Sequence, residues 1–130
     1  MSEQGAQRLD HVGVLVRSLD GATEIYERLG LRVERTIRMV HEGRELPIAF
    51  LDAGGAHLEL IEAPHLLDAG ADPLHHVCFA VADVEAELAR LADAGVPLAD
   101  ERPRPGAVAA KVAFLRPEAA DGVLIELAEH

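Results

Sequence analysis

The chain has 130 residues and a formal net charge of -11, from 12 Lys and Arg against 23 Asp and Glu. This acidic balance excludes nucleic acid as a partner and disfavours anionic membranes, because both are bound through clusters of Lys and Arg. A single cysteine, a polar N-terminal stretch and the lack of an apolar run of about 18 residues predict one cytoplasmic domain over residues 1–130, without a disulfide, signal peptide or membrane span.

The first half of the chain predicts a strand, a helix and three further strands. Residues 9–16 (LDHVGVLV) are rich in the residues that favour strands. Ser18 and Asp20 supply helix N-cap chemistry, and Gly30 stands where a helix commonly ends. The sequence DAGG then signals a hairpin turn. The predicted elements of this half are a strand at 9–16, a helix at about 18–29, and strands at 31–40, 46–51 and 56–62.

The second half repeats this plan. Residues 74–81 (LHHVCFAV) nearly copy residues 9–16, at an offset of 65 residues, which is half the chain. Asp83 caps the next predicted helix, and Gly95 ends it at the same offset from the glycine of the first half. The predicted strands of the second half lie at 74–81, 96–100, 111–115 and 122–127.

The repeat predicts the fold class. Two copies, each with one helix and several strands, fit a pair of fused units better than a solenoid. We predict an α+β fold with two tandem β-α-β-β-β modules at residues 9–62 and 74–127. The stretch at 63–73 has Pro near both ends and Gly in the middle, and is predicted to link the modules.

Polar residues recur at matching positions of the two modules. Each module has a histidine near the start of its first strand, His11 or His76, and a glutamate in its last strand, Glu59 or Glu126. Two neutral imidazoles and two carboxylates suit a borderline divalent metal such as Zn, Co or Ni, and four ligands leave a position for substrate or water. The simpler interpretation, a solvated histidine and a glutamate on the solvent face of a strand, is weakened because the pattern occurs twice.

The other histidines are predicted not to be metal ligands. His75 points away from the face of His76 if both lie in one strand. His57 has the same strand parity as Glu59, but it lies beside the DAGG turn, where solvation is expected. The remaining histidines lie in predicted loops or at the last position: His41, His65 and His130.

Several stretches together carry a family resemblance: LDHVGVLV, HLELIE, LHHVCFAV, the P-x-P-G at residues 103–106, KVAFLRP and GVLIEL. They resemble methylmalonyl-CoA epimerases, which belong to the vicinal oxygen chelate superfamily together with glyoxalase I. The resemblance covers about residues 9–129 and implies a cupped, glyoxalase-like open barrel sheet around a divalent ion, Co, Zn, Ni or Mn. It also implies that His11, Glu59, His76 and Glu126 are the metal ligands, the same set that the repeat indicates.

The resemblance implies an epimerase that inverts the α-carbon of a malonyl-type acyl thioester. Such an inversion needs a base on each face of that carbon, and Glu126 is one candidate through its second carboxylate oxygen. In the family the other base is a glutamate in the turn between the second and third strands, where this chain reads HEGRE. Glu42 is favoured over Glu45 because the family places the acid just before a glycine. The superfamily also leads us to expect a homodimer.

Two other functions remain open at the level of the sequence. One is a glyoxalase-like isomerase or lyase that acts on a thiol adduct, and the other is a non-catalytic ligand-binding protein of the same fold. The linker before the His75–His76 pair is shorter than in epimerases, which leaves both CoA and a smaller acyl carrier open. The basic residues Arg102, Arg104 and Lys111 are candidate contacts for a carboxylate or phosphate, with exposed solubilising charges as the alternative.

Overall fold

The computed structural model describes residues 4–130, which form two compact units. The N-half unit comprises His11–His75, and the C-half unit comprises the described residues up to Asp10 together with His76–His130. The chain therefore passes between the units at two peptide bonds, Asp10–His11 and His75–His76.

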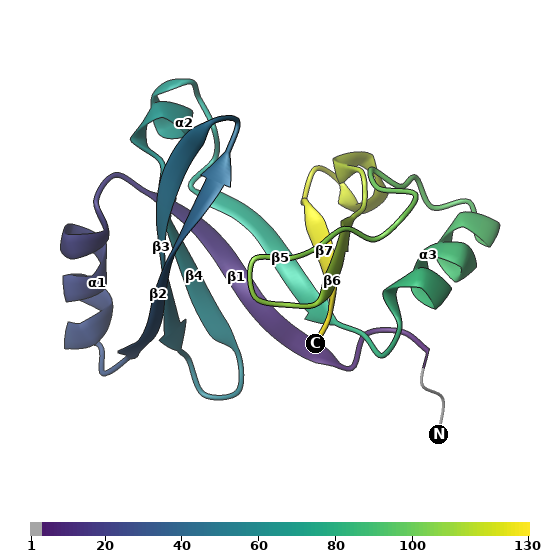
Figure 1. Ribbon diagram of the computed structural model, residues 1–130, viewed down its shortest axis with the longest axis horizontal. Coiled ribbons are helices and arrows are strands. Elements are labelled where there is room, and N and C mark those ends of the chain that lie inside the picture. The colour runs from purple at the N-terminus through teal and green to yellow at the C-terminus, as the bar shows by residue number, and fades with distance from the viewer. Residues whose placement is uncertain (1–3) are drawn as a thin grey trace. The chain divides into compact units, whose positions relative to one another are not determined.

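The N-half unit contains most of the elements predicted for the first module. Its strands follow the order β2-β3-β4-β1, with β1 parallel to β4 and the other pairs antiparallel (Figure 1). The β-α-β-β-β prediction is confirmed here, with ends shifted by one to two residues. The elements are β1 (Arg8–Val16), α1 (Leu19–Arg28), β2 (Arg32–His41), β3 (Arg44–Asp52), β4 (His57–Glu62) and α2 (Pro64–Asp68).

The ends of α1 follow the predicted capping chemistry. The backbone N–H of Gly21 donates to Oγ of Ser18 over 3.3 Å, so Ser18 is the N-cap. Gly30 follows the C-cap residue with a φ of 95°, a conformation that costs glycine nothing but strains other residues. The helix therefore starts and stops where local backbone chemistry dictates.

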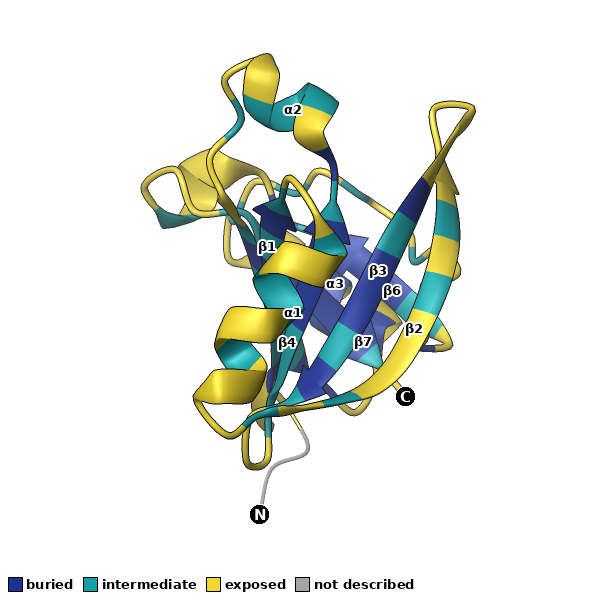
Figure 2. Ribbon diagram, turned by 90° about the vertical axis from the view of Figure 1, so that its left-hand side faces the viewer, coloured by how far each residue is buried: buried dark blue, intermediate teal, exposed yellow. Residues whose placement is uncertain are grey.

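The sheet of the N-half unit has two different faces, because successive residues of a strand point to opposite sides. On the side of α1, which we call the helix face, Ala49, Leu51 and Leu60 are buried among half-buried apolar side chains. On the other side, Leu15 and Ile48 pack in a second cluster. Strand β3 is largely buried, whereas the outer strand β2 alternates between exposed and half-buried residues (Figure 2). By strand parity the second face also carries His11 and Glu59, and we call it the histidine face.

The predicted linker at 63–73 is partly helical. Pro64 occupies the first turn of α2, where its fixed φ and missing N–H are tolerated. Leu66 and Leu67 then pack against the apolar cluster of the histidine face. The Pro and Gly content predicts only a linker here; the helical turn forms because the Leu66–Leu67 pair has an apolar surface to cover.

In the C-half unit the strands follow the order β5-β7-β6. Strand β5 is parallel to β7, and β6 is antiparallel to β7. Asp83 caps α3 by accepting a hydrogen bond from Ala86 N over 3.0 Å, and Gly95 follows its end with a φ of 82°. The elements are β5 (Leu74–Ala80), α3 (Val84–Asp93), β6 (Lys111–Phe114), the 3-10 helix η1 (Pro117–Ala120) and β7 (Ile125–Glu129).

Two strand predictions for the second half were wrong in extent. Residues 96–100 do not form a strand; this region pairs with the sheet only through the isolated bridge between Leu98 and Leu115. Pro97, like the prolines that follow it, has no N–H to give to a ladder. The last strand begins at Ile125 rather than at residue 122, because Asp121 and Gly122 adopt positive φ after η1.

The C-half sheet repeats the division into two faces. Leu88 of α3 packs with Ala113 and Leu127 on the helix face. Cys78, Val112 and the other small residues of a separate buried cluster lie on the opposite face, which by parity carries His76 and Glu126. Within residues 4–130 the longest helices, α1 and α3, have ten residues each, so no helix there is long and apolar enough to cross a membrane.

The described N-terminal residues are held to the C-half unit by a buried carboxylate. Glu87 of α3 accepts hydrogen bonds from Gly5 N over 2.9 Å and from Arg90 Nη2 over 2.6 Å. The carboxylate is buried, whereas Arg90 is partly exposed. The hydrogen bond from Arg90 holds the pKa of the Glu87 carboxyl below its ordinary value, although burial opposes this shift. A second contact, from Gln7 N to Ala80 O over 2.9 Å, continues the attachment.

We expect Glu87→Gln to lower the free energy of unfolding by about 1–2 kcal/mol near pH 7, because it removes hydrogen bonds to a charged group. The folded-state pKa is depressed, so this contribution is present above the unfolded-state pKa and is lost as pH falls through the folded-state value. Denaturant unfolding of both proteins between pH 7 and pH 3 should show the difference shrinking in acid. Glu85→Gln is the matched control, since Glu85 forms a surface ion pair with Lys111 and its replacement should change stability little.

Candidate metal centre

The N-half unit brings His11 and Glu59 together. Strand β1 lies parallel to β4, with Gly13 opposite Glu59. His11 is two residues before Gly13 in β1, so its side chain lies on the same face of the sheet as Glu59. His11 Nε2 is 3.6 Å from Glu59 Oε1, and both side chains are about nine-tenths buried. The ring of Phe50, which pairs with Glu59 from β3, meets His11 edge-on at 6.4 Å between centroids.

The C-half unit brings His76 and Glu126 together in the same way. Here Cys78 stands opposite Glu126 across the parallel pair of β5 and β7. His76 Nε2 is 3.3 Å from Glu126 Oε1, again with both side chains about nine-tenths buried. Phe114 pairs with Glu126 from β6 and meets His76 edge-on at 6.0 Å.

Both units thus contain the same trio of histidine, glutamate and phenylalanine. The parallel pairing of each first strand with each last strand places the glutamate opposite the residue two positions after the histidine. The antiparallel neighbour then contributes the aromatic ring. The sequence interpretation missed both phenylalanines. A signal was present, since IAFL at residues 48–51 and VAFL at 112–115 place them 64 residues apart.

The donor atoms of each pair fit neighbouring positions around one divalent ion. Ligand atoms bound to an ion at about 2.0–2.2 Å lie roughly 3.0–3.5 Å apart. The separations of 3.6 Å in the N-half pair and 3.3 Å in the C-half pair are close to that range. Imidazole nitrogen with carboxylate oxygen is also a donor set that borderline metals accept. Each pair therefore suits half of a four-ligand site.

The two glutamates considered as the second base lie in different environments. Glu42 occupies the tip of the β2–β3 turn with a φ of 51°, and its side chain is 83% exposed. Glu45 lies in β3 at the parity of Ala49 and Leu51, the helix face, and contacts Arg38 at 4.0 Å. Glu45 therefore points away from the face that carries His11, which leaves Glu42 as the better candidate.

The residues predicted not to be ligands have other partners. His57 Nε2 lies 2.8 Å from Glu34 Oε2, and both side chains are well exposed. His130 Nε2 lies 2.7 Å from the buried Asp10 Oδ1. Lys111, one of the basic residues considered as a contact for a carboxylate or phosphate, pairs with Glu85 instead.

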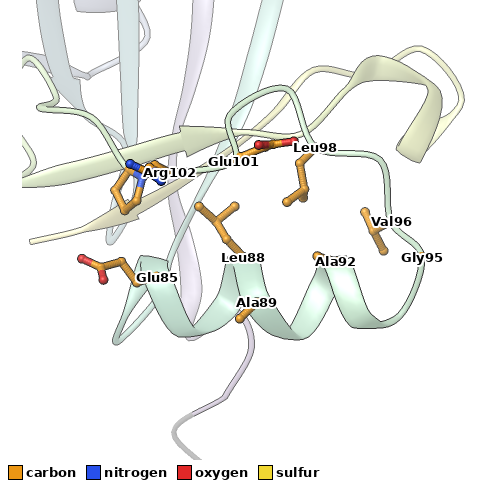
Figure 3. Close-up of a pocket in the computed structure, with 10 residues that line it drawn as sticks. Glu85, Leu88, Ala89, Ala92, Gly95, Val96, Leu98, Glu101 and Arg102 are labelled. Carbon is orange, nitrogen blue, oxygen red and sulfur yellow. The ribbon is translucent and has the colours of Figure 1, made fainter.

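A surface cavity of about 860 Å³ lies beside α3 in the C-half unit, between the helix and the segment that follows it (Figure 3). Its walls include Leu88 and Leu98, which belong to the cluster on the helix face. Arg102 and Glu85 lie at its rim. This cavity is thus on the side of the C-half sheet opposite to His76 and Glu126. The sheet therefore lies between Arg102 and the His76–Glu126 pair.

The chain is similar to several known proteins along most of its length. The profile of the Glyoxalase/Bleomycin resistance protein/Dioxygenase superfamily matches residues 10–114. Uncharacterized protein YqjC of Bacillus subtilis is 39% identical, over 94% of this chain and 91% of its own length. The Ethylmalonyl-CoA/methylmalonyl-CoA epimerase of Cereibacter sphaeroides is 31% identical, over 92% and 96%. The crystal structure of methylmalonyl-CoA epimerase from Mycobacterium tuberculosis matches with a TM-score of 0.82 at 29% identity, covering 99% of this chain and 91% of that one. The predicted α+β fold of the glyoxalase type is confirmed.

Proposed function

Because the chain belongs to the Glyoxalase/Bleomycin resistance protein/Dioxygenase superfamily, we propose that it is a metal-dependent epimerase of malonyl-type acyl thioesters. Methylmalonyl-CoA is the first substrate to test, since relatives at about 30% identity are named for it. The observation that carries the proposal is the duplicated pair of a largely buried histidine with a buried glutamate, at 3.6 Å in one unit and 3.3 Å in the other.

We propose that His11, Glu59, His76 and Glu126 hold one divalent ion. When bound, such an ion supplies Lewis acidity that stabilises negative charge on the carbonyl oxygens of the substrate as its α-proton leaves. The burial of each pair is consistent with the role, because buried charged groups are either paired with one another or coordinate a metal. Phe50 and Phe114 support the orientation of the histidine rings through their edge contacts.

Two carboxylates then move the proton. Glu126, whose Oε1 lies 3.3 Å from His76 Nε2, is assigned to take the α-proton on one side of the substrate. Glu42 is assigned to the other side, because Glu45 points to the helix face. The exposed position of Glu42 implies that it approaches the substrate from the rim of the site.

The metal requirement predicts a change in stability. At a free metal concentration about 100 times the dissociation constant, Co²⁺ or Zn²⁺ should add about 2.7 kcal/mol to the free energy of unfolding. We expect His76→Ala to lose this metal-dependent gain and His57→Ala to keep it, since His57 pairs with Glu34 instead. Denaturant midpoints with metal and with chelator measure both. If no divalent metal co-purifies and none shifts the wild-type midpoint, a non-catalytic binding protein replaces the enzyme as the better reading.

The reaction itself is tested by isotope exchange. Metal-loaded protein is incubated with methylmalonyl-CoA in deuterated water, and the α-deuterium content and the configuration are followed together. We expect both exchange and inversion. A protein that binds metal but exchanges no α-proton, and instead converts a hemithioacetal of glutathione, is a glyoxalase-like isomerase.

A further inference from the structure

The two histidine faces differ at one charged position. In the N-half unit, Ile37 of β2 pairs with Ile48 of β3 and packs in the apolar cluster. In the C-half unit, Val112 of β6 corresponds to Ile48, because each stands two residues before the phenylalanine of its strand. Arg104 pairs with Val112 through an isolated β-bridge and so takes the place of Ile37. Arg104 is therefore a cation where the repeat predicts an apolar residue, and it lies on the face that carries His76.

Arg104 is one aromatic ring away from the C-half pair. Its guanidinium carbon lies 5.1 Å from the centroid of the Phe114 ring, within the range of a cation–π contact. The same ring meets His76 edge-on and stands opposite Glu126 in the sheet. A ligand held at His76 and Glu126 would therefore have this guanidinium beside it.

The orientation of Arg104 is fixed by its neighbours. Its Nε lies 3.4 Å from Asp100 Oδ2, and the same oxygen accepts a hydrogen bond from Phe114 N over 2.9 Å. Asp100 thus engages the Nε edge, while the two terminal nitrogens of a guanidinium carry four further N–H donors. The segment returns to β6 through a tight turn, in which a Cβ on Gly106 would come within 2.7 Å of Val112 Cγ1. The side chain remains 57% exposed, so a ligand can reach it.

We propose that Arg104 binds an anionic oxygen group of the ligand held at the His76–Glu126 pair, and so selects acidic thioesters over neutral ones; this rests on the proposed function. A guanidinium matches carboxylate and phosphate geometry through two parallel hydrogen bonds. In a chain with a net charge of -11, a cation on this face gives an anionic ligand a local attraction against the overall negative charge. The anion is either the acyl carboxylate or a phosphate of the carrier.

The test compares Arg104→Gln and Arg104→Lys with the matched control Arg102→Gln, whose side chain lies at the cavity on the helix face. Steady-state exchange is measured with methylmalonyl-CoA and with methylmalonyl-N-acetylcysteamine, a thioester without phosphates. We expect Arg104→Gln to raise KM about 10- to 100-fold with little change in kcat, Arg104→Lys to recover part of the loss, and Arg102→Gln to leave KM unchanged. A rise with both thioesters identifies the acyl carboxylate, and a rise with the CoA ester alone identifies a carrier phosphate.

A second readout is independent of catalysis. Calorimetric binding of malonate and of CoA to the metal-loaded proteins should show at least about a 10-fold loss for one of these probes in Arg104→Gln and none in Arg102→Gln. Equal affinities in wild type and Arg104→Gln, or no binding of either probe to wild type, overturn the proposal for Arg104. A fall in kcat alone, not recovered by Lys, also overturns it and makes Arg104 a support for Phe114. Loss of the proposed function is recognised separately, as wild-type protein that binds a probe but exchanges no α-proton.

Discussion

Replacing Glu126 by Gln is expected to lower the rate of α-proton exchange by about 10²- to 10⁴-fold, the range that a positioned general base contributes. An amide has nearly the shape of the carboxylate, but it cannot take the proton. Its carbonyl oxygen can still face His76, which lies 3.3 Å from Glu126 Oε1 in the native protein. We therefore expect the variant to fold and to keep part of its metal affinity. Exchange of methylmalonyl-CoA in deuterated water, followed by mass spectrometry, measures the effect.

The matched control for this variant is His57→Ala. His57 shares the strand and the face of Glu59, yet it is bound to Glu34 at the exposed end of β4. It should retain exchange within a few-fold of wild type. Full activity in Glu126→Gln, or loss of activity in His57→Ala with metal still bound, would show that the ligands and the base are wrongly assigned.

The second large effect is expected for Glu42→Gln, and it separates the two halves of the reaction. If each base serves one face of the α-carbon, this variant should lose inversion by about 10²- to 10⁴-fold while Glu126 still exchanges the proton of one epimer. The signature is deuterium incorporation from one epimer without formation of the other. Each pure epimer is incubated in deuterated water, and its label and configuration are followed in time.

Glu45→Gln is the control that the fold itself supplies. Glu45 is only three residues from Glu42, but it lies on the helix face and contacts Arg38 at 4.0 Å. Its replacement should leave inversion unchanged. If Glu45→Gln blocks inversion and Glu42→Gln does not, then Glu45 is the second base, and the strand parity that assigns Glu45 to the helix face is misleading here.

The sequence was informative where the chain repeats itself. The shared LxHV pattern places His11 and His76 at the same point of two strands. The two long helices each begin at an N-cap residue and end just before a glycine, so their bounds follow from local chemistry alone. The pairing of each histidine with a glutamate more than 45 residues away depends on parallel strand neighbours, which a single sequence does not specify. The duplication supplied that information, because the same two residue types recur at matching places.

Prediction failed where packing or proline decides the backbone. Residues 96–110 read as a strand start and a loop, but only two isolated bridges form there, at Leu98 and Arg104. The prolines of this region remove the donors of a continuous ladder. The choice between Glu42 and Glu45 also needed the structure, because a one-residue slip in a turn reverses the face of every following side chain.

The direct pairing of residues on the histidine faces suggests how the protein's selectivity could be redesigned. Where the N-half unit pairs Leu15 with Ile61, the C-half unit pairs Ala80 with Ala128, so large aliphatic side chains are exchanged for methyl groups at matching register. The trio of histidine, glutamate and phenylalanine is unchanged beside them. Ala80 and Ala128 are both buried. Enlarging either side chain therefore tests whether this difference in size between the two faces affects the choice of substrate, with the proposed proton-transfer groups unchanged.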